Sequence, residues 1–416
     1  MNSPQAISFL KQSMLTVEQA RTFIFAHITP PNCIEKLAIR STLERFIAED
    51  IKSTINVPSH TNSAMDGYAI NGQDIPLKGE ARLTVTGSVF AGQPLQQTIQ
   101  AGQCARIMTG GMMPAGTDTV IMQEDVQRNS DTINIQAQHK AGQNVRQAGE
   151  DLAIGQVALH QGQKIMPAEL GILASLGIAE IRVWRRLRVA FFSTGNELRS
   201  IGDVLADGEV YDSNRYSLYG MLSRLGIEII DMGVIPDQPT AIRHAFESAA
   251  ENADVIISSG GVSVGEADFI KQTLNSMGEI KLWKIAMRPG CPLAFGKVKN
   301  AFFFGLPGNP VAVMVTFYQF VQDALLLMSG AEQKPRLRLQ LPTTSNIKKR
   351  PGRTEFIRGI ISSDSDGNMS VTSTGQQGSG ILNSMSRANC FIVLGHDDGP
   401  VSKADMVLVE PFDGFI

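Results

Sequence analysis

Four loops in the second half of the sequence combine small residues with carboxylates, which is an arrangement suited to a phosphate-bearing ligand. They are residues 193–198 (STGNEL), the loop at Asp237, residues 259–268 (SGGVSVGEAD) and residues 306–312 (LPGNPVA). Glycine-rich turns let backbone N–H groups approach an anion, because glycine has no side chain in the way. The spacing therefore predicts an anion site built largely from main-chain donors.

The same loops carry three carboxylates, Glu197, Asp237 and Asp268. Mg²⁺ commonly binds through one or two carboxylates plus phosphate oxygens, so these residues are the candidate metal ligands. Taken alone, each carboxylate is more typical of a helix N-cap or a solvated loop. Four loops of this kind in one part of the chain favour a site.

Cationic residues form a second group. Lys284 and Arg288 precede a turn at Pro289-Gly290 in residues 283–296 (WKIAMRPGCPLAFG), while Arg353 and Arg358 precede Ser379 in residues 375–382 (GQQGSGIL). An arginine fork with hydroxyl and backbone N–H donors can hold a tetrahedral oxyanion. Solvated surface cations are the alternative interpretation, and spacing alone does not decide between the two.

Several common site types are missing from the sequence. It contains no G-x-x-x-x-G-K-[ST] loop, no G-x-S-x-G nucleophile motif and no dinucleotide fingerprint. Its histidines are scattered, and Cys33, Cys104, Cys291 and Cys390 are too far apart for metal-ligand spacing. P-loop, serine-hydrolase and zinc chemistry are therefore not indicated.

Strands and helices, which must position these loops, alternate along this part of the sequence. From residue 187 to 330, short apolar runs alternate with helical patterns, which predicts an α/β domain with a three-layer, largely parallel sheet. In such sheets the ligand lies at the carboxyl ends of the strands, where the four loops begin. Residues 15–50 and 167–176 have helical patterns, whereas the chain after 330 is typical of a β module. Short β-type runs, typical of an inserted module, occupy residues 81–89, 103–108, 119–123 and 132–137.

The bulk properties are those of an ordinary globular protein. The chain has 416 residues and a formal charge of −3, which gives no reason to expect a nucleic-acid or anionic-membrane partner. The apolar stretch 311–328 is interrupted by Thr316, Gln319, Gln322 and Asp323, so we expect a buried or amphipathic helix there. Residues 1–14 lack the features of a secretory signal, and we expect a cytoplasmic protein.

Seven motifs taken together resemble the MoeA family of molybdopterin molybdenumtransferases, to which the gephyrin C-terminal domain also belongs. They are NSAMDGYA, RIMTGGMMPAGTDTVIMQE, GEDL, STGNEL, SSGGVSVGEAD, MRPGCPLAFG and GLPGNPVA, in family order across the chain. The resemblance implies four domains: I at 1–53 and 152–185, II (an inserted β-rich module) at 54–151, III (α/β, molybdopterin-binding) at 186–330, and IV (a β barrel) at 331–416. It also implies a homodimer whose cleft is shared between protomers.

The resemblance further implies roles for individual residues. Molybdate is inserted into adenylylated molybdopterin, with Mg²⁺-dependent release of AMP. By this resemblance, the pterin and its phosphates bind to the glycine loops (Ser259, Gly260, Gly261, Ser263, Gly265, Pro307, Gly308 and Asn309). Molybdate binds to Lys284, Arg288, Arg358 and Ser379. The catalytic positions are Asp66, Thr109, Asp151, Glu197, Asp237 and Asp268, of which the last three are also the metal ligands. The adenylyltransferase that precedes it and the molybdoenzymes that receive the cofactor are the implied partners.

Three positions depart from the family pattern. Arg288 stands where lysine is usual, Cys291 where a second lysine is frequent, and Asn196 where some members carry Asp. Three alternatives stay open at this stage: a molybdopterin-binding scaffold without turnover, an enzyme of related fold that acts on another nucleotide, and an insertase that prefers tungstate. The full set of carboxylates and cations disfavours the scaffold, and the full-length resemblance disfavours the second alternative.

Overall fold

The computed structural model describes residues 14–31, 33–261 and 277–412. It divides into two compact units. The small unit consists of Lys36–Leu43 and Ile47–Arg182. The large unit contains the described chain from Val183 onward, together with the N-terminal segment up to Glu35 and residues Glu44–Phe46. The division into four domains stays a prediction.

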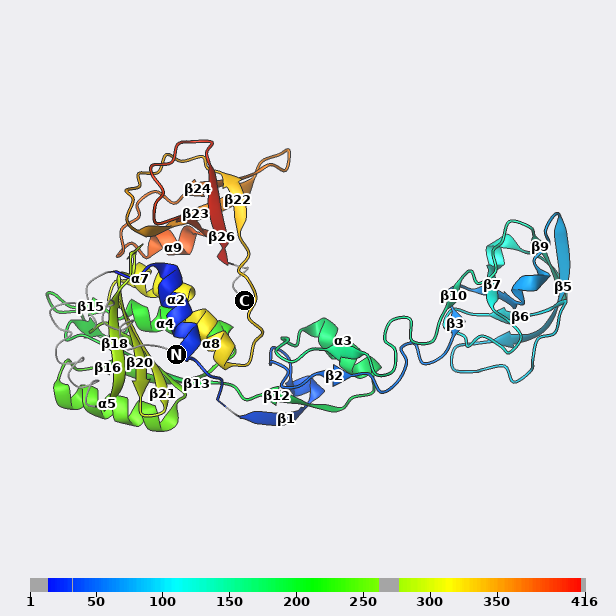
Figure 1. The fold of residues 1–416 in the computed structure, drawn as a ribbon, viewed down its shortest axis with the longest axis horizontal. Helices are drawn as coiled ribbons and strands as arrows, with labels where there is room; N and C mark the ends of the chain where they lie inside the picture. The colour runs from blue at the N-terminus through cyan, green and yellow to red at the C-terminus, as the bar shows by residue number, and fades with distance from the viewer. Residues whose placement is uncertain (1–13, 32, 262–276, 413–416) are drawn as a thin grey trace, which may run out of the picture. The chain divides into compact units, whose positions relative to one another are not determined.

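A six-stranded sheet forms the centre of the large unit, in the order β16-β13-β17-β21-β20-β18 (Figure 1). Four neighbouring strands run parallel: β16 (Glu228–Ile235), β13 (Arg188–Thr194), β17 (Val255–Ser259) and β21 (Ala301–Leu306). β20 (Pro292–Val298) and β18 (Gly278–Lys284) complete the sheet in antiparallel orientation. The α/β prediction is confirmed.

Helices cover both faces of this sheet because its strands carry apolar side chains on both faces. Phe191, Ile257 and Phe304 point to one face, where they pack in a core with α2, α4, α7 and α8. Phe192, Ile256 and Phe303 point to the other, where they meet Ile242 and Phe246 of α5. The helices are α2 (Val17–His27), α4 (Ser213–Arg224), α5 (Pro239–Asn252), α7 (Pro310–Thr316) and α8 (Gln322–Met328).

The apolar stretch near residue 320 forms one continuous helix of α7, a π-helical turn η5 (Phe317–Val321) and α8. By length and composition, Pro310–Met328 could span a membrane, but 78% of the tested window is buried inside the protein. Thr316, Gln319 and Gln322 are buried within it. This segment is a core helix, as its interrupting polar residues predict.

The C-terminal segment is mainly β structure, as predicted. Its sheet has the order β19-β23-β25-β26-β22, with β24 paired to β23. β19 precedes β20 in sequence and pairs in parallel with β23, so the α/β segment contributes a strand to the C-terminal sheet. The elements are β19 (Met287–Arg288), β22 (Leu339–Pro342), β23 (Thr354–Ser363), β24 (Met369–Ser373), α9 (Asn383–Arg387), β25 (Cys390–Leu394) and β26 (Met406–Pro411).

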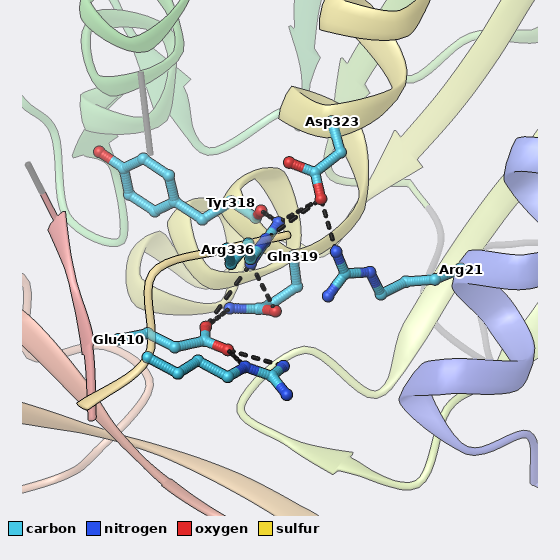
Figure 2. A network of polar contacts seen from close by, with 7 residues as sticks. Arg21, Tyr318, Gln319, Asp323, Arg336 and Glu410 are labelled. Atoms are coloured by element: carbon cyan, nitrogen blue, oxygen red, sulfur yellow. Dashed lines mark hydrogen bonds and ion pairs between the residues drawn. The ribbon is translucent and has the colours of Figure 1, made fainter. Parts of the chain in front are cut away.

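A network of charged and polar side chains joins the N-terminal helix, the core helix and the C-terminal sheet (Figure 2). Asp323 accepts hydrogen bonds from Arg21 (2.6 Å) and Arg336 (2.8 Å). Glu410, which is fully buried, accepts from Arg338 (3.0 Å) and from Gln319 of the π turn (3.1 Å). Burial, followed by repulsion from Arg336, lowers the pKa of Arg21. The two carboxylates are therefore needed to keep these cations together.

The small unit contains the predicted β module. Its six-stranded sheet has the order β7-β4-β6-β5-β9-β8, and β5, β6, β7 and β9 cover the four β-type runs of the sequence. The elements from residue 34 to 184 are β1 (Ile34–Ala38), η2 (Ile39–Ser41), β2 (Ile51–Lys52), β3 (Asn62–Ser63), β4 (Gly67–Ile70), η3 (Gly72–Asp74), β5 (Glu80–Val89), β6 (Gln103–Ile107), β7 (Thr119–Met122), η4 (Gln123–Asp125), β8 (Gln127–Asn129), β9 (Thr132–Gln136), β10 (Val145–Arg146), β11 (Val157–Leu159), α3 (Pro167–Ser175) and β12 (Glu180–Trp184).

One helix prediction is wrong. Residues 35–50 have a helical pattern in the sequence, but they form β1, the short helix η2 and loop structure. β1 pairs with β12, and the N–H of Ala48 bonds to the carbonyl of Arg182 (3.1 Å). Main-chain partners some 140 positions away along the sequence thus replace the hydrogen bonds of a local helix.

Replacing Glu410 by Ala should destabilise the large unit by about 3–5 kcal/mol, because it leaves buried polar partners uncompensated. Thermal unfolding followed by circular dichroism measures the loss. Glu251→Ala, which removes an exposed carboxylate paired with Lys299 at 2.9 Å, is the matched control and should change little. Equal effects of the two substitutions would contradict this view of the network.

Candidate functional site

The carboxyl ends of the parallel strands meet at one edge of the sheet. Ser193 of β13 is in register with Ser259 of β17, and Ser259 with Leu306 of β21. Thr194 is likewise in register with Ile235 at the end of β16. The four loops that the sequence singled out therefore start side by side, as the parallel-sheet argument predicts.

Two of these loops approach each other through glycine. Gly260 has a φ of +88°, and its N–H donates to the carbonyl of Leu306 at 3.2 Å. A Cβ atom at Gly260 would lie 2.6 Å from the carbonyl oxygen of Thr194. A Cβ built on Gly308 lies 4.0 Å from the Cα of Gly260. Backbone thus lines this part of the edge closely, because glycine leaves no side chain between the loops.

The described carboxylates lie on the two neighbouring loops. The N–H of Asp237 donates to the side-chain oxygen of Asn196 at 3.3 Å, which joins the loops after β16 and β13. The Glu197 carboxylate folds back over Gly195, where an added Cβ would be 2.7 Å from it. Across residues 14–31, 33–261 and 277–412, no group of three His, Cys, Asp or Glu side chains is placed to hold a metal ion. Ser263, Gly265 and Asp268 lie outside the described residues.

Two residues that the sequence analysis missed lie at this edge. Asp212 caps α4 by accepting the N–H of Arg215 at 3.1 Å. Asn214 donates from Nδ2 to Ser259 Oγ at 2.9 Å and to the carbonyl of Gly308 at 2.7 Å. An Asp two residues before an Asn at the start of a helical pattern was the available signal, but it is typical of any N-cap.

At the same edge gather buried polar atoms that find no hydrogen-bond partner in the part of the chain that the structure describes. They are Ser193 Oγ, Thr194 Oγ1, Asp212 Oδ2, Asn214 Oδ1 and Ser258 Oγ. Buried polar groups in folded proteins nearly always have partners, so such a cluster needs an explanation. A polar ligand or enclosed water would supply it.

A second centre surrounds Arg358 of β23, which is only 1% exposed. Its guanidinium donates to Ser384 Oγ at 3.0 Å and to the carbonyl of Gly378 at 3.1 Å. Among the described residues no carboxylate forms an ion pair with it, and burial, followed by repulsion from Arg288, lowers its pKa to about 10. Both arginines line a cavity of about 260 Å³, together with Lys348, Glu355 and Gln377. An anion entering this cavity would meet a buried cation that lacks a counter-ion.

The other predicted oxyanion residues are placed differently. Ser379 follows Gly378, and its carbonyl accepts the N–H of Val311 at 3.0 Å. The loop around Ser379 therefore contacts the start of α7, directly after Gly308 and Asn309. Lys284 ends β18 with an exposed side chain, and no described contact joins it to Arg358. The structure thus brings Arg288, Arg358 and the Ser379 loop together, and leaves Lys284 at the strand end.

Asp66 and Thr109 form a pair in the small unit. The backbone N–H and the hydroxyl of Thr109 both donate to one Asp66 oxygen, at 2.7 and 2.8 Å. These two bonds, the backbone one contributing most, lower the pKa of Asp66. Asp151 is exposed, and its N–H donates to the carbonyl of Val57 at 3.0 Å. No described contact joins Asp151 to the Asp66–Thr109 pair.

Comparison with known protein families accounts for nearly the whole chain. Residues 15–177 match the MoeA N-terminal region (domain I and II), residues 190–326 match a probable molybdopterin binding domain, and residues 340–412 match the MoeA C-terminal region (domain IV). The chain belongs to the MoeA family.

Individual relatives agree with this membership. The chain is 46% identical over 402 residues to the molybdopterin molybdenumtransferase of Haemophilus influenzae, covering 96% of this chain and 99% of that protein. It is 33% identical to the gephyrin of Dictyostelium discoideum, covering 90% of this chain and 59% of that one. The solved molybdopterin biosynthesis moeA protein of Pyrococcus horikoshii OT3 has a TM-score of 0.84 at 27% identity, over 96% of this chain and 100% of that one.

Gly260→Ala should destabilise the large unit more than Gly208→Ala. Both glycines have positive φ, +88° and +86°, so both substitutions carry a backbone penalty of about 1 kcal/mol. Only at Gly260 does the added Cβ also collide with backbone, at roughly 1–3 kcal/mol more, because nothing lies within 4 Å of a Cβ at Gly208. Thermal unfolding measures both variants, and equal losses would show that the Thr194 contact does not constrain the loop.

Thr109→Val should raise the pKa of Asp66 part of the way to its ordinary value, because the hydroxyl bond is lost and the stronger backbone bond remains. The folded-state pKa is depressed, so the interaction stabilises the fold above the carboxyl's ordinary pKa and is lost as pH falls through the depressed value. Carboxyl ¹³C titration by NMR, assigned with Asp66→Asn, measures this. Thr132→Val, which removes a hydroxyl bonded to Asn129 at 3.1 Å, is the control and should leave Asp66 unchanged.

Proposed function

We propose that this MoeA-family protein is a molybdopterin molybdenumtransferase, which inserts molybdate into adenylylated molybdopterin and releases AMP. The observation that carries the proposal is that two complementary anion sites occur in one compact unit. One is the glycine-lined strand edge with its unpartnered polar atoms, and the other is the buried Arg358. The relative from Haemophilus influenzae bears this activity in its name.

The two sites are joined by a short stretch of chain. Gly308 belongs to the loop at the strand edge, and Val311, three residues later, donates its N–H to the carbonyl of Ser379 beside the Arg358 cavity. A ligand with phosphates on the glycine loops can therefore extend toward an oxyanion held at Arg358. The reaction requires this proximity, because the dithiolene sulfurs of molybdopterin must reach the molybdate.

Arg358 is the residue best suited to hold molybdate. Its Nε and one terminal nitrogen are bonded to Ser384 and Gly378, which fixes the plane of the guanidinium. A buried cation without a counter-ion is unfavourable. Binding of an oxyanion is therefore favoured, because the oxyanion supplies the counter-ion. Arg288 adds positive charge to the same cavity. Ser379 belongs to the adjoining loop, and Lys284 would complete the set by reaching in from the end of β18.

Mg²⁺ would be the cofactor held by these loops. Glu197 and Asp237 lie on loops joined through Asn196, and carboxylate oxygens plus ligand phosphates are the donors that Mg²⁺ prefers. Asp268 would be the third ligand. When bound, Mg²⁺ would neutralise the charge that develops on phosphate as the bond between AMP and molybdopterin is cleaved.

Asp66, Thr109 and Asp151 would act in a cleft shared between two copies of the chain, with the small unit of one copy facing the strand edge of the other. The depressed pKa of Asp66 supports its part, because it keeps the carboxylate ionised and hydrogen-bonded in one orientation by Thr109. An exposed aspartate with a fixed orientation suits an interaction with a ligand donor or a bound cation. No covalent intermediate on the protein is required.

The test is AMP release from adenylylated molybdopterin in the presence of Mg²⁺, measured as a function of molybdate concentration. Release that depends on molybdate is expected. Its absence, with the pterin still bound, would overturn the catalytic assignment.

Arg358→Lys should raise the molybdate concentration for half-maximal release by roughly tenfold or more, because a lysine cannot reproduce the planar fork. The matched control is Arg387→Lys, at an exposed arginine in the last turn of α9, which should behave as the unaltered protein. An unchanged molybdate dependence in Arg358→Lys would move the oxyanion site elsewhere.

A further inference from the structure

One side chain at the strand edge joins two of the glycine loops. Asn214 lies in the first turn of α4, and its Nδ2 group contacts Ser259 at the end of β17 and Gly308 beyond the end of β21. Strand pairing aligns β17 with β21 only as far as Ser259 and Leu306. Asn214 therefore bonds to Gly308, which lies beyond the last residue of β21 that pairs with β17.

The orientation of the Asn214 amide is determined by its partners. The Gly308 carbonyl can only accept a hydrogen bond, so the NH₂ group must face it, and the amide oxygen must point away. That oxygen is buried and finds no hydrogen-bond partner among the described residues. A buried acceptor without a hydrogen bond lowers folding stability by about 1–3 kcal/mol. This arrangement of the Asn214 amide is therefore not optimised for stability.

The helix that carries Asn214 is well anchored. Asp212 caps its first turn through the N–H of Arg215, and Leu218 and Leu222 are fully buried against the central sheet. Asn214 therefore acts from a rigid support, and its two contacts can set the separation of the loops.

We propose that Asn214 is a positioning residue that holds the Ser259 and Gly308 loops at the spacing required by the phosphate-bearing substrate. This inference rests on the proposed molybdenumtransferase activity. Ser259 and Gly308 stand at and just beyond the ends of β17 and β21, at the strand edge where the proposed phosphate site lies, and a misplacement of about 1 Å between groups that contact a substrate can cost on the order of 100-fold in rate. Gly308 also precedes the start of α7, so its position affects the path from the phosphates to the Arg358 cavity.

Asn214→Asp tests the contact with Gly308. The substitution preserves size but places an oxygen against the Gly308 carbonyl, which repels it, while the Ser259 hydroxyl can still donate to the new carboxylate. The KM for adenylylated molybdopterin should rise roughly tenfold or more, with a smaller change in kcat. Asn214→Ala, which removes both contacts without adding charge, should act in the same direction.

Asn252→Asp is the matched control. Asn252 ends α5 and donates from its amide to the carbonyl of Ser248 at 2.8 Å, and α5 leads into the start of β17, at the opposite edge of the sheet from the loops. It carries the same chemical change and should leave KM unaltered. Thermal unfolding of all three variants measures the structural cost separately.

The outcomes separate the possibilities. A rise in KM in both Asn214 variants, without a matching loss of thermal stability, supports positioning. An unchanged KM overturns the inference, and turnover by the unaltered protein then still supports the proposed function. If the variants lose thermal stability while the KM of the folded fraction is unchanged, Asn214 has a structural role alone. If the unaltered protein releases no AMP, the proposed function fails and the inference fails with it.

Discussion

Parallel pairing of β16, β13, β17 and β21 is the constraint on which the site depends. Because the strands are in register at their carboxyl ends, loops separated by more than 100 residues in sequence start from one edge of the sheet. Apolar side chains on both faces hold the strands in this register, since a slip by one residue would turn every side chain to the opposite core. The glycines can then approach one another without a side chain between them.

The Arg358 cavity depends on a second constraint, the attachment of the C-terminal sheet to the α/β segment. β19 contributes a strand to that sheet and carries Arg288 into the cavity wall. The charge network of Asp323 and Glu410 joins the same parts of the chain through Arg336 and Arg338 (Figure 2). The π turn supports this junction, because Gln319 within it bonds to Glu410 and the Tyr318 carbonyl accepts from Arg336.

The two proposed anion sites use different physical means. At the strand edge, glycine lets the backbone of neighbouring loops approach closely, as Gly260 does beside Thr194 and Leu306. At Arg358, a buried guanidinium is oriented by neutral partners, Ser384 and Gly378, and no carboxylate of the described residues forms an ion pair with it. The first arrangement suits phosphates carried on an organic ligand, and the second suits a compact tetrahedral oxyanion.

Local chemistry was enough to predict much of this from the sequence. Glycine loops after apolar runs, alternation of strands and helices, and a polar-interrupted core helix all depend on neighbouring residues, and each was predicted correctly. Residues 35–50 were predicted wrongly because β1 obtains its partner from β12, far along the chain. Asn214 resembled an ordinary residue near an N-cap until the fold placed it between Ser259 and Gly308.

The sequence by itself therefore determined the family, the α/β and β segments, and the loops that start from one edge of the sheet, because residue types and short spacings encode these directly. Only the tertiary structure decided which side chains meet. Among the described residues Arg358 forms no ion pair with a carboxylate, and Asn214 joins two loops. Both follow from packing among distant segments, and no local pattern of residues specifies such contacts.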